Sequence, residues 1–146
     1  MDLTKQSGAL AGREAATAQD VVALIGRILL AAMFVISGWG KLTGFAGTAG
    51  YISSQGLPLP ALFAAAAIVI ELGGGLLILL GWKARWAALG LALFLVIITP
   101  IFHNFWGAPP EARMGQLINF QKNVSILGGM LLLYAFGPGR HSIDKG

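Results

Sequence analysis

Four long stretches of the chain carry almost no charged side chains, and each has about the length of one membrane crossing. A membrane helix needs roughly 20 mostly apolar residues to cross about 30 Å of hydrocarbon. The hydropathy pattern predicts four such spans, at residues 21–42, 61–80, 86–106 and 117–136. A chain of 146 residues has too little other surface to bury four all-apolar helices in water. The pattern therefore predicts an all-α integral membrane protein.

The connections between the predicted spans are short except the first, so consecutive helices are expected to be antiparallel neighbours in a four-helix bundle. Residues 1–20 form an N-terminal tail, residues 21–136 the four-span domain and residues 137–146 a C-terminal tail. The first connection is uncharged and partly apolar, which predicts a short helix at the membrane interface. Asp20 is the expected N-cap of the first span, and Gly137-Pro138-Gly139 is expected to end the fourth.

Composition supports the membrane prediction and excludes several kinds of cofactor. Charged residues make up 11% of the chain, whereas a soluble domain carries about 25%. The absence of Cys excludes disulfides, thiol redox pairs and iron-sulfur clusters. The two His residues, His103 and His141, are predicted at opposite faces of the membrane, so no haem or metal site is expected from this chain. Redox work would require a diffusible quinone or a partner that carries the cofactor.

The distribution of Lys and Arg predicts the orientation, because cytoplasmic connections hold the excess of these residues. One side of the predicted membrane holds Lys5, Arg13, Lys83, Arg85, Arg140 and Lys145. The other side holds only Lys41 and Arg113. Both termini are therefore expected in the cytoplasm. Nothing in this distribution forms the basic groove that nucleic-acid binding requires.

Three charged residues fall inside predicted spans, where each costs about 2.5 to 3.5 kcal/mol. They are Arg27, Glu71 and Lys122. Glu71 lies near the middle of the second span, and Arg27 lies about 7 Å from the centre of the first. We therefore predict an ion pair between Arg27 and Glu71. Such a pair could fix the register of two helices or serve a proton relay or ligand site, and the sequence leaves both roles open.

A second set of polar residues is expected at one depth near the outer face. Its members are Lys41, His103, Asn104, Asn119, Lys122 and Asn123. Aromatic residues surround this set, namely Phe102, Phe105, Trp106 and Phe120. Together they predict an outward-facing pocket for an anionic or carbonyl-bearing ligand. The alternative is that Lys41 and Lys122 reach toward the lipid headgroups while the amides cap helix ends, and for Lys41 alone this interpretation is favoured.

Several motifs, in this order, resemble those of the DoxX family of small bacterial membrane proteins. They are Arg27, Ser37-Gly38-Trp39-Gly40-Lys41-Leu42, Gly56-Leu57-Pro58-Leu59-Pro60, Glu71-Leu72-Gly73-Gly74, Phe102-His103-Asn104-Phe105-Trp106 and Asn119-Phe120-Gln121-Lys122-Asn123. The resemblance implies a four-helix protein of the bacterial inner membrane. It also implies a relationship to DoxD, a subunit of a thiosulfate-oxidising, quinone-reducing enzyme. Some family members are linked to membrane oxidoreductase complexes with soluble partners.

Two functions are compatible with these observations. In the first, the chain is a membrane subunit of a quinone-linked or sulfur-metabolism oxidoreductase complex. Its candidate catalytic residues are Glu71, Arg27, His103 and Lys122. Its candidate ligand-binding residues are Lys41, Asn104, Trp106, Asn119 and Asn123. In the second, it is a non-catalytic anchor for a partner protein.

Transport of a small solute is less favoured, because the chain has no internal repeat and no pair of broken helices at mid-membrane. The expected partners are the lipid bilayer, a soluble or membrane redox protein and, as a homo-oligomer, a second copy of the chain.

Overall fold

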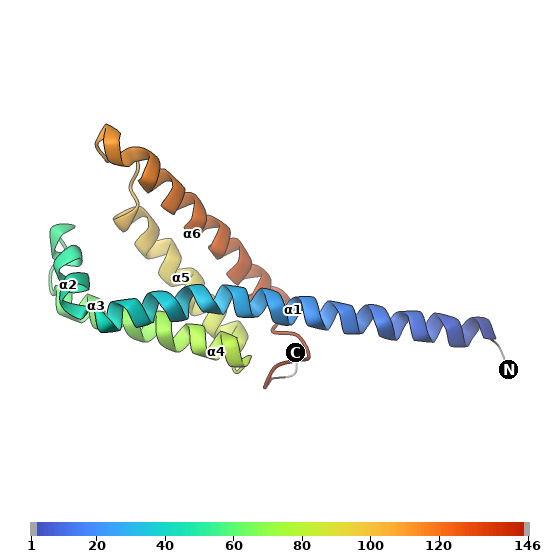
Figure 1. Ribbon diagram of the computed structural model, residues 1–146. Coiled ribbons are helices and arrows are strands. Elements are labelled where there is room, and N and C mark those ends of the chain that lie inside the picture. The colour runs from blue at the N-terminus through green and yellow to red at the C-terminus, as the bar shows by residue number, and fades with distance from the viewer. Residues whose placement is uncertain (1–2, 145–146) are drawn as a thin grey trace.

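The computed structural model describes residues 3–144, and this part of the chain contains helices, turns and loops but no strand (Figure 1). The α-helices are α1 (Leu3–Thr43), α2 (Phe45–Ser54), α3 (Pro60–Ile68), α4 (Gly74–Leu80), α5 (Ala84–Phe102) and α6 (Pro110–Phe136). A π-helical turn, η1 (Val69–Gly73), joins α3 to α4, so residues 60–80 form one continuous helical rod. The all-α prediction is confirmed.

Three helices in the described part of the chain are long and apolar enough to cross a membrane. They cover Gln6–Thr43, Pro60–Leu80 and Ala84–Phe102. The fourth, α6, has 27 residues, but its first half carries the polar residues of the Asn119–Asn123 motif. It lies antiparallel to α5, as hydrogen bonds between their side chains show, and it therefore shares the depth of α5. The chain is a helical membrane bundle.

The first helix extends far beyond the predicted span. It runs without interruption from Leu3, so the prediction that Asp20 caps its beginning is wrong. The segment before Asp20 contains no Pro and is rich in Ala, the strongest helix former. In Figure 1 this segment projects away from the bundle. We call residues 3–20 the N-terminal arm.

A short helix, α2, occupies the first connection, as predicted. Ile52 is its buried residue. The ring of Tyr51 packs against that of Phe102 with a centroid distance of 5.7 Å, so α2 contacts the end of α5. We call this end of the molecule the α2 end.

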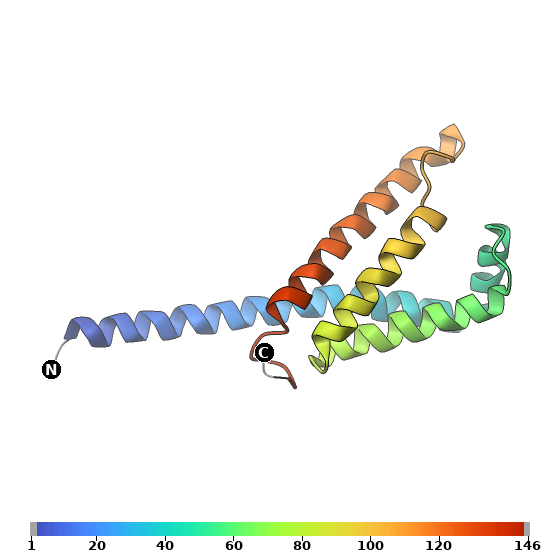
Figure 2. The same ribbon diagram turned by 180° about the vertical axis from the view of Figure 1, so that it is seen from behind.

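The long helices form two antiparallel pairs. α1 packs against the rod of residues 60–80, and α5 packs against α6. The pairs meet at the opposite end of the molecule and diverge toward the α2 end (Figures 1 and 2). The core lies where all of them meet and includes Phe34, Ile78, Leu91, Leu95 and Met130.

The residues after α6 fold back under the bundle. Gly137, with a φ of +87°, ends α6 as predicted. The backbone N–H groups of Ile143 and Asp144 donate to the carbonyls of Leu80 and Gly81. The carboxylate of Asp144 accepts a hydrogen bond from the backbone N–H of Ala84, at the beginning of α5. We call residues 137–144 the C-terminal strap, and this end of the molecule the strap end.

Candidate functional site

The close approach of α1 to η1 sets the geometry of the site. A Cβ atom added to Gly38 would lie 2.7 Å from the backbone nitrogen of Leu72, so only a glycine fits there without displacing a backbone. One turn farther along α1, Lys41 lies beside Glu71. Glu71 is in the π-helical turn, a feature that is frequent at functional sites because it alters the direction of side chains within a helix. The sequence motif that contains Gly38 therefore contacts the motif that begins with Glu71.

Lys41 and Glu71 form an ion pair. The Lys41 Nζ lies 2.8 Å from the Glu71 Oε2 and also donates to the Ser37 Oγ at 2.6 Å. The Glu71 side chain is 5% exposed and that of Lys41 is 30% exposed. The interpretation that Lys41 reaches toward the headgroups was therefore wrong, because its ammonium turns inward to the carboxylate. Sequence reasoning missed Ser37, although its spacing of four residues from Lys41 on a helix predicts a contact.

The predicted ion pair between Arg27 and Glu71 is also wrong. Arg27 is 4% exposed, and its guanidinium donates to the carbonyl of Pro138 at 2.7 Å and to that of His141 at 2.6 Å. The register explains this, because Gly38 faces Leu72 and Arg27 lies about 16 Å nearer the strap end. Arg27 thus holds the C-terminal strap. Its Nε has no hydrogen-bond partner among the described residues.

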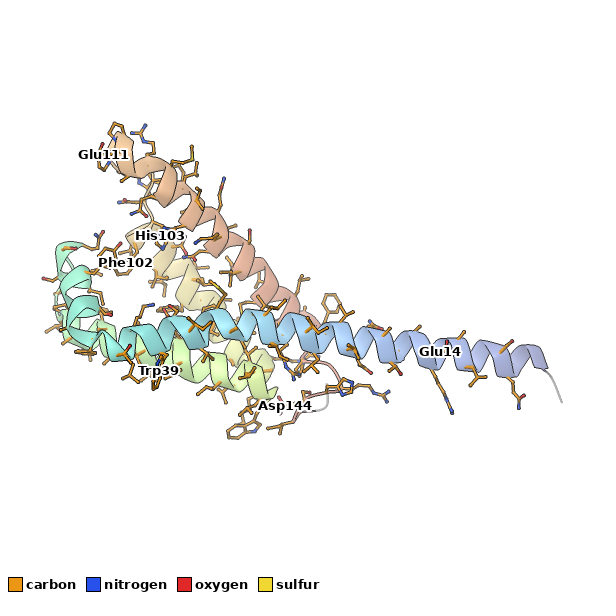
Figure 3. The ribbon with its side chains drawn as sticks, in the orientation of Figure 1. Glu14, Trp39, Phe102, His103, Glu111 and Asp144 are labelled. Carbon is orange, nitrogen blue, oxygen red and sulfur yellow. The ribbon has the colours of Figure 1, made fainter. Side chains whose placement is uncertain are left out.

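Polar groups of α5 and α6 face this ion pair. The His103 Nδ1 lies 3.0 Å from the Gln116 Oε1, and the Asn123 Nδ2 donates to the Thr99 Oγ1 at 3.1 Å. Gln116 and Thr99 were missed by sequence reasoning. Gln116 could have been found, because it lies seven residues before Asn123 and therefore on the same helical face. Figure 3 shows His103 at the α2 end of α5.

A cavity of about 140 Å³ lies between these groups. Its lining comes from α1, η1, α5 and α6 and consists of Met33, Phe34, Ser37, Lys41, Glu71, Phe94, Leu95, Ile98, His103, Asn123 and Ile126. Four of the residues singled out from the sequence therefore surround one cavity: Lys41, Glu71, His103 and Asn123.

The other candidate residues lie outside the cavity lining. Asn104, Trp106 and Lys122 are exposed, and Asn119 is half-buried. The helix α5 ends at Phe102, so Asn104 and Trp106 belong to the following loop. There, Trp106 packs edge to face against Phe105 and Phe120, with centroid distances of 5.2 and 5.9 Å. Lys122 is adjacent to Asn123, and neighbouring residues of a helix point about 100° apart.

A substitution at Gly38 tests the register of α1 against η1. Gly38→Ala is expected to destabilise the bundle by about 2 kcal/mol, because the new methyl group overlaps the Leu72 backbone. Gly40→Ala is the matched control, since a Cβ there has nothing within 4 Å, and we expect a change below about 0.5 kcal/mol. Unfolding by SDS in mixed micelles measures both. Equal effects at the two positions would contradict the close approach.

Two bacterial inner membrane proteins are similar to this chain over most of its length. The inner membrane protein YqjF of Escherichia coli is 41% identical over 130 residues, which are 87% of this chain and 92% of that protein. The inner membrane protein YphA of the same organism is 40% identical over 128 residues, 88% of this chain and 91% of that protein. A Surfeit locus protein 4 homologue of Schizosaccharomyces pombe is 35% identical over 71 residues, but these are only 24% of that protein. No solved structure matches the chain significantly.

The sequence profile of the DoxX family matches residues 22–104. This range contains Lys41, Glu71 and His103, and it ends before α6 supplies Asn123. The full-length relatives and the apolar helices make the chain a multi-pass protein of the inner membrane. Since the profile covers more than half of its length, the chain belongs to the DoxX family.

Proposed function

We propose that the chain is the membrane subunit of a quinone-linked oxidoreductase, and that its cavity holds the quinone head group. The observation that carries this proposal is the set of polar groups around the cavity, where the Lys41–Glu71 pair faces His103 and Asn123. A bound quinone would accept two electrons from a partner protein that carries a redox cofactor and would take up two protons to become the quinol. The membrane location supports the proposal, since quinones dissolve in the bilayer.

The cavity fits one six-membered ring. Its volume is about 140 Å³, and apolar protein cavities of about 150 Å³ hold benzene. Phe34 and Phe94 contribute aromatic surface to the lining, against which a flat ring can pack. Hydrogen-bond donors for carbonyl oxygens come from both helix pairs.

Within the described part of the chain, four polar residues of the lining keep a hydrogen-bonding group for the ligand. Lys41 donates two of its three N–H groups, to Ser37 and Glu71, so the third is available for a carbonyl oxygen. The Nδ1 of His103 lies 3.0 Å from the Gln116 Oε1, which leaves Nε2 for the ligand. With a proton on Nε2, the ring would donate to a carbonyl oxygen and supply a proton that quinone reduction consumes. Glu71 Oε1 would relay the second proton to the reduced ring. Asn123 keeps one N–H free to orient the ring.

The proposal includes an orientation in the membrane. The strap end and the N-terminal arm carry most of the Lys and Arg residues, which favours the cytoplasm for both termini. Lys41 and His103 then lie toward the periplasmic side. Protons would exchange with that side.

Bound quinone tests the proposal directly. The protein, extracted in mild detergent, is expected to retain quinone, detected by mass spectrometry. His103→Ala removes a group that lines the cavity and is expected to weaken quinone binding about tenfold or more. Lys122→Ala is the matched control, because Lys122 is exposed and outside the cavity lining, and it is expected to retain quinone. Loss of quinone in both variants, or in neither, would contradict the site.

The N-terminal arm favours a second candidate function, that of a membrane anchor for a partner protein. Its described side chains from Gln6 to Gln19 are exposed, so this part of the helix offers a surface on which a partner protein can pack. The two functions are separable. An anchor requires the arm and tolerates Glu71→Gln, whereas quinone chemistry requires Glu71 and tolerates removal of residues 2–19.

A further inference from the structure

We propose that the cavity binds the head of an amphiphile, and that its apolar tail leaves the bundle sideways, between α1 and α6, into the bilayer. This inference rests on the proposed quinone function. It narrows the ligand to quinones that carry a long apolar tail, and it identifies the route by which they reach the site.

The cavity is polar toward one end and apolar toward the other. Along α1 its lining passes from Met33 and Phe34 to Ser37 and Lys41, a distance of about 12 Å toward the α2 end. Along α5 it passes in the same direction from Phe94 to His103. The polar residues thus lie near the α2 end and the apolar residues nearer the middle of the helices. A ligand with a polar head and an apolar tail matches this order.

The volume of the cavity excludes a whole tailed molecule. Sites for drug-sized ligands usually measure about 300 to 1,000 Å³, whereas this cavity measures about 140 Å³. The head alone fits inside, so a tail must lie outside the cavity. In a membrane protein the favourable surroundings for such a tail are lipid and apolar side chains.

The charges of the cavity favour an uncharged head. Its lining contains one cation and one anion, Lys41 and Glu71, and they neutralise each other at 2.8 Å. An anionic head would have to break this pair or remain without a countercharge, which is costly in a site of low polarity. An uncharged, carbonyl-bearing ring leaves the ion pair intact and can form hydrogen bonds with the polar groups of the lining.

The opening lies between the first and last helices. α1 and α6 are in contact near the strap end, where a Cβ on Gly129 would lie 2.9 Å from Leu30. From there the two helices diverge toward the α2 end (Figures 1 and 2). Met33, one turn beyond Leu30, lines the cavity and is also 50% exposed. A residue that is both lining and half-exposed marks the mouth of the cavity.

Two of the contacts between neighbouring helices are closed at this level. Gly38 and the Lys41–Glu71 pair join α1 to η1, and the hydrogen bonds of His103 and Asn123 join the α2 end of α5 to α6. The rod and α5 are in contact one turn nearer the strap end, at Gly74 and Leu91, and diverge beyond it (Figures 1 and 2). Of the two sides that diverge, the gap between α1 and α6 is where a tail can leave, because Met33 is the exposed residue among those that line the cavity.

Photolabelling can map the tail. The probe is a benzoquinone with a long alkyl tail that carries a diazirine on one of the carbons nearest the ring, and the competitor is the same ring without a tail. After irradiation in lipid nanodiscs, adducts are expected on α1 and α6 beside the gap, near Met33 and at Ile126 to Gly129. Excess competitor is expected to remove them. Adducts that are spread equally over lipid-facing Val69 and Val96, or that resist competition, would overturn the inference.

A pair of tryptophan variants provides a second test. Met33→Trp obstructs the mouth and is expected to weaken binding of the tailed quinone about tenfold while changing that of the tail-less ring less than about threefold. Val96→Trp places the same side chain on the lipid-facing side of α5 and is expected to change the binding of neither ligand. Equal weakening of both ligands by Met33→Trp would overturn the tail route and leave the proposed function intact. If the wild-type protein binds neither ligand, the proposed function fails, and the route fails with it.

Discussion

Lys41→Met is expected to destabilise the bundle by about 2 to 3 kcal/mol, because it leaves the Glu71 carboxylate buried without its partner. Glu71→Gln is expected to cost less, about 1 kcal/mol, although it breaks the same pair. The two energies differ because the side chains that lose their partner differ in exposure. The Lys41 side chain is 30% exposed and can turn its ammonium toward water or headgroups, whereas the Glu71 side chain is 5% exposed and cannot escape.

The double variant, Lys41→Met with Glu71→Gln, separates stability from function. With both charges removed, stability is expected to return to within about 1 kcal/mol of the wild type. Quinone retention is expected to be lost, since the ammonium that would donate to a carbonyl oxygen is gone. Unfolding in SDS-containing mixed micelles and mass spectrometry of bound quinone give the two readouts. If the double variant retains quinone, the pair serves register alone and the anchor function gains support.

The fold could be predicted largely from the sequence because lipid imposes simple rules. A span must be about 20 residues long and mostly apolar, and these requirements placed the rod of residues 60–80 and α5 to within a few residues at most ends. The N-terminal arm was not predicted, because helix propensity outside the membrane is a weak signal next to hydropathy. The divergence of the two helix pairs has no local sequence signal at all, since it depends on packing between distant segments.

The site was only partly predictable, and the reason is register. Depth estimates counted residues from the centre of each span, which placed Arg27 nearer to Glu71 than Lys41. The actual register depends on the contact of Gly38 with Leu72. The hydropathy of a glycine does not indicate that two helices approach each other closely at that residue. His103 and Asn123 do line the cavity, and both could be placed because the predicted spans put them at a similar depth near the outer face. Lys122 was misplaced because depth says nothing about the direction in which a side chain points.

Arg27→Ala is expected to release the C-terminal strap and to destabilise the protein by about 3 kcal/mol. The substitution removes two charge-assisted hydrogen bonds, to the carbonyls of Pro138 and His141, and leaves acceptors without partners at a buried position. Arg27→Lys is expected to restore part of the loss, because an ammonium lacks the forked geometry that reaches two carbonyls. Arg13→Ala on the exposed N-terminal arm is the matched control and is expected to change nothing.

The strap can be followed with a thiol, because the chain has no Cys of its own. Ser142→Cys places a reporter at a half-buried position of the strap, close to Gly81. With Arg27 present its reaction with a maleimide is expected to be slow, and with Arg27→Ala about tenfold faster or more. Bound quinone should persist in the folded Arg27→Ala protein, since Arg27 lies outside the cavity lining. The opposite result, lost quinone with an unchanged labelling rate, would mean that Arg27 acts on Glu71 and that the observed register is wrong.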